Sequence, residues 1–76
     1  MKLDLKQAFG KVLRELRESR DMSQQELADY AEIDRTYLSD LERGLNNPTL
    51  NVVFKLAEVL EVKPGDFVNK IDKAMQ

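Results

Sequence analysis

The stretch QQELADYAEIDRTYLSDLER, Gln24–Arg43, decides the fold of this chain. It holds two short helical patterns separated by Glu32–Asp34, a segment too short for anything but a turn. Its apolar residues suit a tight crossing of two helices, with most facing inward and one filling the turn. These residues are Leu27, Ala28, Ala31, Ile33, Leu38 and Leu41. Such a crossing leaves the outer face of the second helix projecting from the domain.

Local signals mark the ends of these two helices. Ser23 and Glu26 match a capping box, in which the hydroxyl accepts from a backbone N–H and the glutamate reaches back to the cap. Asp34 is a good N-cap for the next helix, and Gly44 can adopt the left-handed conformation that ends it. The pattern predicts helices over 24–31 and 35–43.

The flanking segments predict three more helices. Before the central stretch, apolar residues recur on one face of a helix from Leu5 to Arg20, namely Leu5, Ala8, Phe9, Val12, Leu13 and Leu16. After it, Thr49 can cap a helix over 50–60, and Pro64 suits the first turn of a last helix that reaches to about residue 75. We expect an all-α fold of five short helices, forming one domain over residues 1–76.

The composition argues against several classes of function. The chain has no cysteine and no histidine, so the thiolates and imidazoles of most metal sites and catalytic centres are missing. We therefore expect no enzyme activity, no metal and no cofactor, and the sequence shows no sensor domain for a small-molecule effector. The longest apolar runs are two to three residues and Met1–Asp4 is not a signal segment, so we expect a cytoplasmic protein with no membrane partner.

The charge balance counts mildly against one class of partner. The 12 basic and 14 acidic residues give a formal net charge of −2. Attraction to nucleic-acid phosphates normally comes from a basic surface. The charge balance affects the non-specific affinity for nucleic acid more than it affects the fold. The positions of the basic residues therefore matter more than their number.

The sequence resembles the phage-repressor and Cro-like helix-turn-helix regulators, also called the xenobiotic-response-element type. The resemblance runs from about Phe9 to Phe67 and depends on MSQQELA at 22–28, LSDLERG at 38–44, and PTL at 48–50 followed by LA at 56–57. Within the family, DRTYLS at 34–39 is most similar to the controller proteins of restriction–modification systems. Glu32 departs from the glycine that the family often has there, at a cost of about 1 kcal/mol if the residue is left-handed.

The resemblance implies a lambda-repressor-like DNA-binding domain with the helix-turn-helix at about 24–43. It implies a sequence-specific regulator of transcription that reads the major groove of double-stranded DNA with helix 35–43, as a homodimer on an inverted-repeat operator. The implied base-contacting residues are Arg35, Thr36, Ser39 and Asp40. The implied backbone-contacting residues are Gln24, Tyr37, Arg43, Asn46 and Asn47. Arg17 and Glu42 match a partly buried ion pair of the family.

Several of these roles have alternatives. Arg35 can be a solvated arginine beside its cap Asp34, and Thr36 an ordinary exposed residue of the first helical turn. The hydroxyl of Tyr37 can meet a phosphate, or its ring can pack against the loop. For the whole chain, the alternative is a protein-interaction or antitoxin-like subunit that keeps the fold with weak or no DNA binding, which the acidic balance favours.

The segment 49–75, which holds the last two helices, offers more apolar surface than one small domain requires. At 100° per residue, the apolar side chains of helix 50–60 cover an arc of roughly 220°. They can complete the core of the subunit or meet a second copy of the chain. The residues expected at a dimer interface are Val52, Leu56, Val59, Phe67, Val68, Ile71 and Met75.

Overall fold

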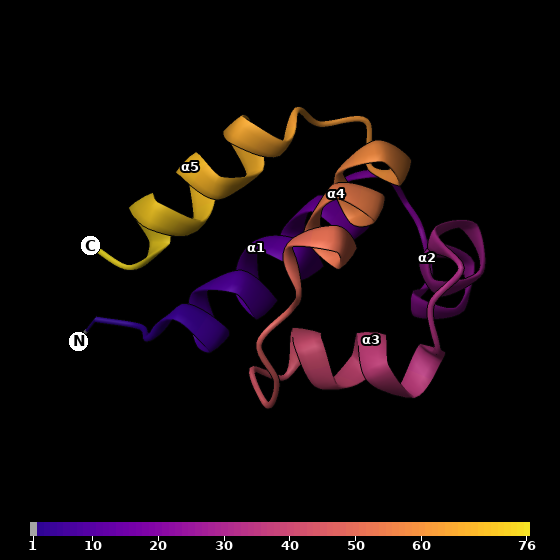
Figure 1. The fold of residues 1–76 in the computed structure, drawn as a ribbon, viewed down its shortest axis with the longest axis horizontal. Helices are drawn as coiled ribbons and strands as arrows, with labels where there is room; N and C mark the ends of the chain where they lie inside the picture. Colours follow the sequence, from indigo (N-terminus) through magenta and orange to yellow (C-terminus); the bar gives the residue numbers. More distant parts are fainter. Residues whose placement is uncertain (1) are drawn as a thin grey trace.

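Five helices follow one another in a computed structural model that describes residues 2–76 (Figure 1). They are α1 (Leu5–Ser19), α2 (Gln24–Ala31), α3 (Arg35–Glu42), α4 (Leu50–Val59) and α5 (Pro64–Ala74). No strand occurs in the described part of the chain. The all-α fold and the order of five helices are confirmed, and each predicted end lies within a residue or so of the observed one.

Side-chain caps begin the first four helices. Ser23 accepts from the backbone N–H of Glu26, and the Glu26 carboxylate accepts in return from the N–H of Ser23, at 3.0 and 2.8 Å. Asp34 and Thr49 cap α3 and α4 as expected. Asp4 begins α1 with a second capping box, which the sequence analysis did not predict. These bonds satisfy backbone N–H groups that have no partner inside a helix.

Four helices end in the same hydrogen-bond pattern. A residue with positive φ donates its N–H to the carbonyl three residues back, and the next residue donates to the carbonyl five back, which is the Schellman motif. Only Gly44, at φ 73°, is a glycine; the other three are Asp21, Glu32 and Glu61. Glu32 has φ 56° and ψ 45°, so the turn of the helix-turn-helix does require a left-handed residue.

The core lies between α1 and the other four helices. The rings of Phe9 and Phe67 stack at a centroid distance of 5.4 Å and join α1 to α5. Leu27 of α2 and Leu38 and Leu41 of α3 are fully buried in the same cluster. This packing anchors the inner faces of α2 and α3 and leaves their outer faces at the surface.

Three residues expected at a dimer interface lie inside the subunit. Leu56 and Phe67 have no exposed surface and Ile71 has 6%. The prediction is wrong for these three, because α5 folds back over α4 and α1, and Phe67 and Ile71 of α5 and Leu56 of α4 all face the core between these helices. The half-buried members of the predicted set, which pack against the core, are Val52, Val59 and Met75. Val68 is half exposed.

The apolar surface that remains exposed has a different composition. Leu5, Leu50 and Val68 line one hollow between α1, α4 and α5. Phe54 is 53% exposed one turn after Leu50 on α4. Of these four residues, the sequence analysis placed only Val68 at an interface.

Candidate nucleic-acid interface

The outer face of α3 is polar and open. Arg35 and Thr36 are exposed in its first turn, while Ser39 and Asp40 are half exposed one turn later. Together with Arg43 they line a shallow depression, and Figure 1 shows α3 along one edge of the molecule. This division follows from the helical repeat, because Leu38 and Leu41 point into the core. The structure therefore brings the four predicted base-contacting residues together on one surface.

The first turn of α3 leaves Arg35 free. The Asp34 carboxylate accepts from the backbone N–H groups of Thr36 and Tyr37, at 2.8 and 3.2 Å. Across residues 2–76 Arg35 has neither a salt bridge nor a side-chain hydrogen bond. This exposed, unpaired side chain fits the solvated arginine given as the alternative, and it also leaves the guanidinium available to a ligand.

The predicted backbone-contacting residues are dispersed around α3. Tyr37 is half buried and packs against the hydrophobic core rather than the loop, and its side chain stays partly exposed. Arg43 is exposed and lies 3.5 Å from the Asp40 carboxylate. Asn46 and Asn47 are exposed in the loop after α3, and Asn47 also borders the apolar hollow.

A buried ion pair joins α1 to the end of α3, as expected. Arg17 donates from Nε to Glu42 Oε2 at 2.7 Å and from Nη2 to Glu42 Oε1 at 2.9 Å. Its Nη1 donates to the Met22 carbonyl at 2.8 Å. The hydrogen bond to Glu42 raises the pKa of Arg17 above its ordinary value. Each nitrogen of the guanidinium and both oxygens of the carboxylate have a hydrogen-bond partner, which offsets the cost of burying the two charges.

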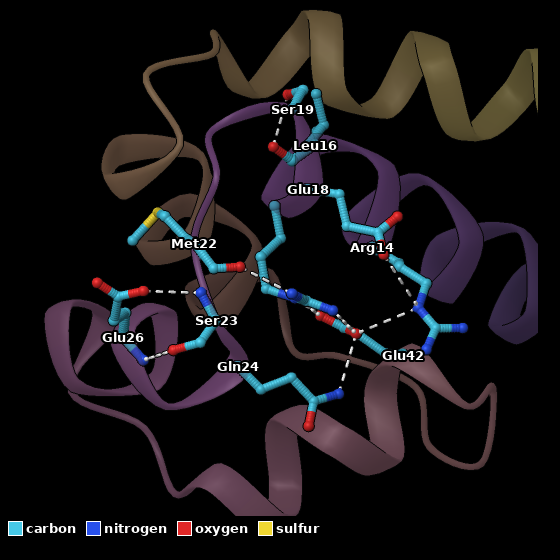
Figure 2. A network of polar contacts seen from close by, with 10 residues as sticks. Arg14, Leu16, Glu18, Ser19, Met22, Ser23, Gln24, Glu26 and Glu42 are labelled. Carbon is cyan, nitrogen blue, oxygen red and sulfur yellow. Dashed lines mark hydrogen bonds and ion pairs between the residues drawn. The ribbon is translucent and has the colours of Figure 1, made fainter.

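Gln24 makes a contact that the sequence analysis did not predict. Its Nε2 donates to Glu42 Oε1 at 3.0 Å, and Figure 2 shows the amide pointing at that carboxylate. One amide hydrogen of Gln24 is therefore already engaged within the protein. Eighteen residues separate the two partners, and no local pattern links them.

The comparisons with known proteins agree with this geometry. A family model described as helix-turn-helix matches residues 13–67, more than half of the chain. The chain belongs to the helix-turn-helix family. It is a member of the Cro/C1-type group of this family. This is the same group of transcriptional regulators that the sequence resembles.

Relatives of this helix-turn-helix protein include restriction–modification controllers. Control protein C.BamHI of Bacillus amyloliquefaciens is 40% identical over 62 residues, which are 80% of this chain and 76% of the relative. Control protein C.MunI of a Mycoplasma species is 35% identical over 71 residues, 92% of this chain and 96% of the relative. The predicted resemblance to controller proteins is confirmed.

Solved structures extend the likeness to three dimensions. Controller protein C.AhdI of Aeromonas hydrophila has a TM-score of 0.79 at 39% identity, over 82% of this chain and 94% of that one. Controller protein C.Esp1396I has a TM-score of 0.85 at 28% identity over 97% of each chain, in a structure of its tetramer with a natural 35 base-pair operator.

One close contact between helices of the helix-turn-helix protein positions α3. A Cβ atom built at Gly10 would lie 2.5 Å from the Leu41 carbonyl oxygen and 2.6 Å from that of Glu42. Only a hydrogen atom fits between α1 and the last turn of α3. Gly10 therefore sets how closely α3 lies against α1, a role that the sequence analysis did not assign.

Arg14 is a second residue that the sequence analysis missed. It follows Gly10 by one helical turn, and its Nε lies 3.9 Å from Glu42 Oε1. Its side chain is 60% exposed. The available signal was the spacing from Arg17, three residues later on α1, which places both arginines on neighbouring parts of one helix face.

Among the helices described, none has the length and apolar character needed to cross a bilayer. Nor do residues 2–76 contain a group of three or more metal-ligating side chains. The relatives found are regulatory proteins rather than enzymes.

Proposed function

We propose that this protein binds double-stranded DNA sequence-specifically and regulates transcription in the cytoplasm by occupying its operator, without catalysis. The observation that carries the proposal is the outer face of α3, where an unpaired Arg35 projects beside exposed polar groups. An α-helix with such a face fits the major groove, which is about 12 Å wide. The operator complex of C.Esp1396I supports this docking.

Base recognition is assigned to the residues around the depression on α3. Arg35 can donate two hydrogen bonds to O6 and N7 of guanine, which is worth about 1–3 kcal/mol of discrimination against other bases. Thr36 can contact a thymine methyl, and Ser39 can donate or accept on a base edge. Asp40 can accept from the amino group of cytosine, with its second oxygen near Arg43.

Backbone contacts on both sides of α3 fix its orientation in the groove. Gln24 at the start of α2 and the hydroxyl of Tyr37 are assigned to phosphates on one side. Arg43, Asn46 and Asn47 are assigned to phosphates on the other side, because they follow α3 in an exposed segment. Most of these donors are neutral. They can bind phosphates without adding positive charge, so a net charge of −2 does not argue against them.

We further assign a homodimer on an inverted repeat. The exposed apolar side chains of Leu5, Leu50, Phe54 and Val68 form a surface that a second copy can cover. Val52, Val59 and Met75 remain as half-buried candidates from the predicted interface. Dimers of this architecture place their recognition helices about 34 Å apart, one turn of B-DNA.

Fluorescence anisotropy of labelled duplexes tests DNA reading. Duplexes from the region upstream of the protein's own gene are compared with a shuffled duplex, using wild type, Arg35→Ala and Arg35→Lys. We expect both variants to lose about 5- to 150-fold on the preferred duplex. Arg35→Lys should keep wild-type affinity for the shuffled duplex, because it keeps the charge but not the two-pronged geometry. Equal affinity of wild type for all duplexes would refute sequence-specific binding and favour the protein-interaction alternative.

Sedimentation equilibrium tests the dimer. Wild type should associate at micromolar concentration, whereas Val68→Asp should be monomeric, because a carboxylate buried in an apolar interface is strongly unfavourable. Lys70→Asp, two residues later on the same helix, is the matched control and should still associate. A monomeric wild type at high micromolar concentration would contradict the dimer.

A further inference from the structure

Nitrogen atoms from α1 and α2 converge on Oε1 of Glu42, which also accepts from Arg17 Nη2. The Glu42 side chain is 2% exposed, and Figure 2 shows Gln24 and Arg14 reaching its carboxylate from different elements. Gln24 Nε2 is 3.0 Å from Oε1, and Arg14 Nε is 3.9 Å from the same atom. The Gln24 amide and the Arg14 guanidinium therefore approach the same carboxylate, one from α2 and the other from α1.

The charges of this cluster do not cancel. Arg17 forms two short hydrogen bonds with Glu42 and neutralises it. The contacts of Arg14, at 3.9 Å to Glu42 and 4.0 Å to Glu18, are too long for hydrogen bonds, and the Glu18 pair is exposed to solvent. Exposed pairs of this kind contribute little stability, so Arg14 loses little when it turns to another anion. Once the exposed Glu18 contact is released, the cluster therefore presents one positive charge, on Arg14, and several N–H donors.

The orientation of the Gln24 amide is determined by its partner. A carboxylate only accepts hydrogen bonds, so the amide must turn its NH₂ group toward Glu42. One of the two hydrogens is used in that bond, and the second remains available for another acceptor. Glu42 thus acts as a positioning residue for Gln24.

The cluster is rigidly joined to the DNA-facing helix. Glu42 is the last residue of α3, and Gly10 holds α1 in direct contact with that turn. Arg14 follows Gly10 by one turn of α1. When α3 lies in the major groove, Arg14 and Gln24 are carried together to the groove edge, where the phosphates are.

We infer that Arg14 is a phosphate-binding residue and that it shares one DNA backbone phosphate with Gln24, an inference that rests on the DNA-binding function proposed above. The phosphate oxygens accept from the Arg14 guanidinium and from the free hydrogen of the Gln24 amide. This contact places a full positive charge against the backbone of DNA, in a protein whose net charge is −2. It contributes affinity without sequence preference, as phosphate contacts do.

The test compares Arg14 in α1 with Arg20 at the C-cap of α1. Each arginine is replaced by glutamine, so each variant loses one positive charge. Arg14→Gln removes the proposed contact, and Arg20→Gln is the matched control, because Arg20 is exposed but engaged with Glu61 at 3.2 Å. Arg14→Gln should weaken binding to the preferred and shuffled duplexes by the same factor, about tenfold. It should also reduce the slope of log K against log salt by about 0.9, and Arg20→Gln should change neither quantity.

The shared phosphate is tested by combining variants. Gln24→Ala and Arg14→Gln together should lose less than the product of their separate losses, since both act on one phosphate. Losses that multiply would overturn the shared site. An Arg14→Gln protein that binds like Arg20→Gln, while wild type binds and Arg35→Ala loses selectivity, would overturn the inference alone. A wild type without sequence-dependent binding would overturn the proposed function instead.

Discussion

Replacing Gly10 with alanine should destabilise the protein, although alanine is the better helix former. The new methyl group would lie 2.5 and 2.6 Å from the carbonyl oxygens of Leu41 and Glu42, where ordinary contact begins near 3.4 Å. These oxygens belong to backbone and cannot rotate away, so the last turn of α3 must retreat by about 1 Å. Overpacking of this kind costs about 1–3 kcal/mol and can cost more, against a gain of about 1 kcal/mol in helix propensity.

The expected balance is a loss of about 0–2 kcal/mol, and each kcal/mol lost lowers Tm by about 4–8 °C in a domain of this size. Urea unfolding followed by circular dichroism at 222 nm measures it. Gly65→Ala in α5 is the matched control, because a Cβ at Gly65 has nothing within 4 Å. That variant should be stabilised by about 0.5 kcal/mol through helix propensity alone. If Gly10→Ala is as stable as Gly65→Ala, the close approach of α1 to α3 does not constrain α3 and the reasoning fails.

Three further changes test the ion pair, the turn and the cap in the same unfolding assay. Arg17→Met should cost about 3–5 kcal/mol by leaving the buried Glu42 carboxylate without its main neutralising partner, and adding Glu42→Met should restore part of that loss; no recovery would contradict the pairing. Glu32→Gly should stabilise by about 0.5–1 kcal/mol, because it relieves a left-handed glutamate and removes a negative charge from the end of α2. Asp34→Ala should cost about 1 kcal/mol through the lost cap of α3, and unchanged stability would mean that solvent replaces it fully.

A local physical argument accounts for the features that were predicted correctly. The capping box of Ser23 and Glu26 spans three residues, and the left-handed Gly44 closes a single helix end. The inward positions of Leu38 and Leu41 follow from helical periodicity within eight residues, and the same periodicity places Arg35 and Thr36 outside. The polar face of α3 was therefore visible before its surroundings were known.

Tertiary structure decided which apolar residues are covered. Helix periodicity places Leu56 on an apolar face of α4, and Phe67 and Ile71 on an apolar face of α5, but it does not show which element covers each face. The stacking of Phe67 on Phe9 depends on α5 folding back against α1, a contact between segments far apart in the chain. Whether an apolar face becomes core or interface is a property of the whole packing arrangement.

The sequence by itself determined the helices, their caps and the outward face of the recognition helix, because these depend on interactions within a few residues. Only the tertiary structure decided that Gly10 sets the position of α3 and that Glu42 joins Arg17, Gln24 and Arg14 into one cluster. Those contacts link residues 18 to 32 positions apart. Their formation depends on how the helices cross, and no local pattern encodes that geometry.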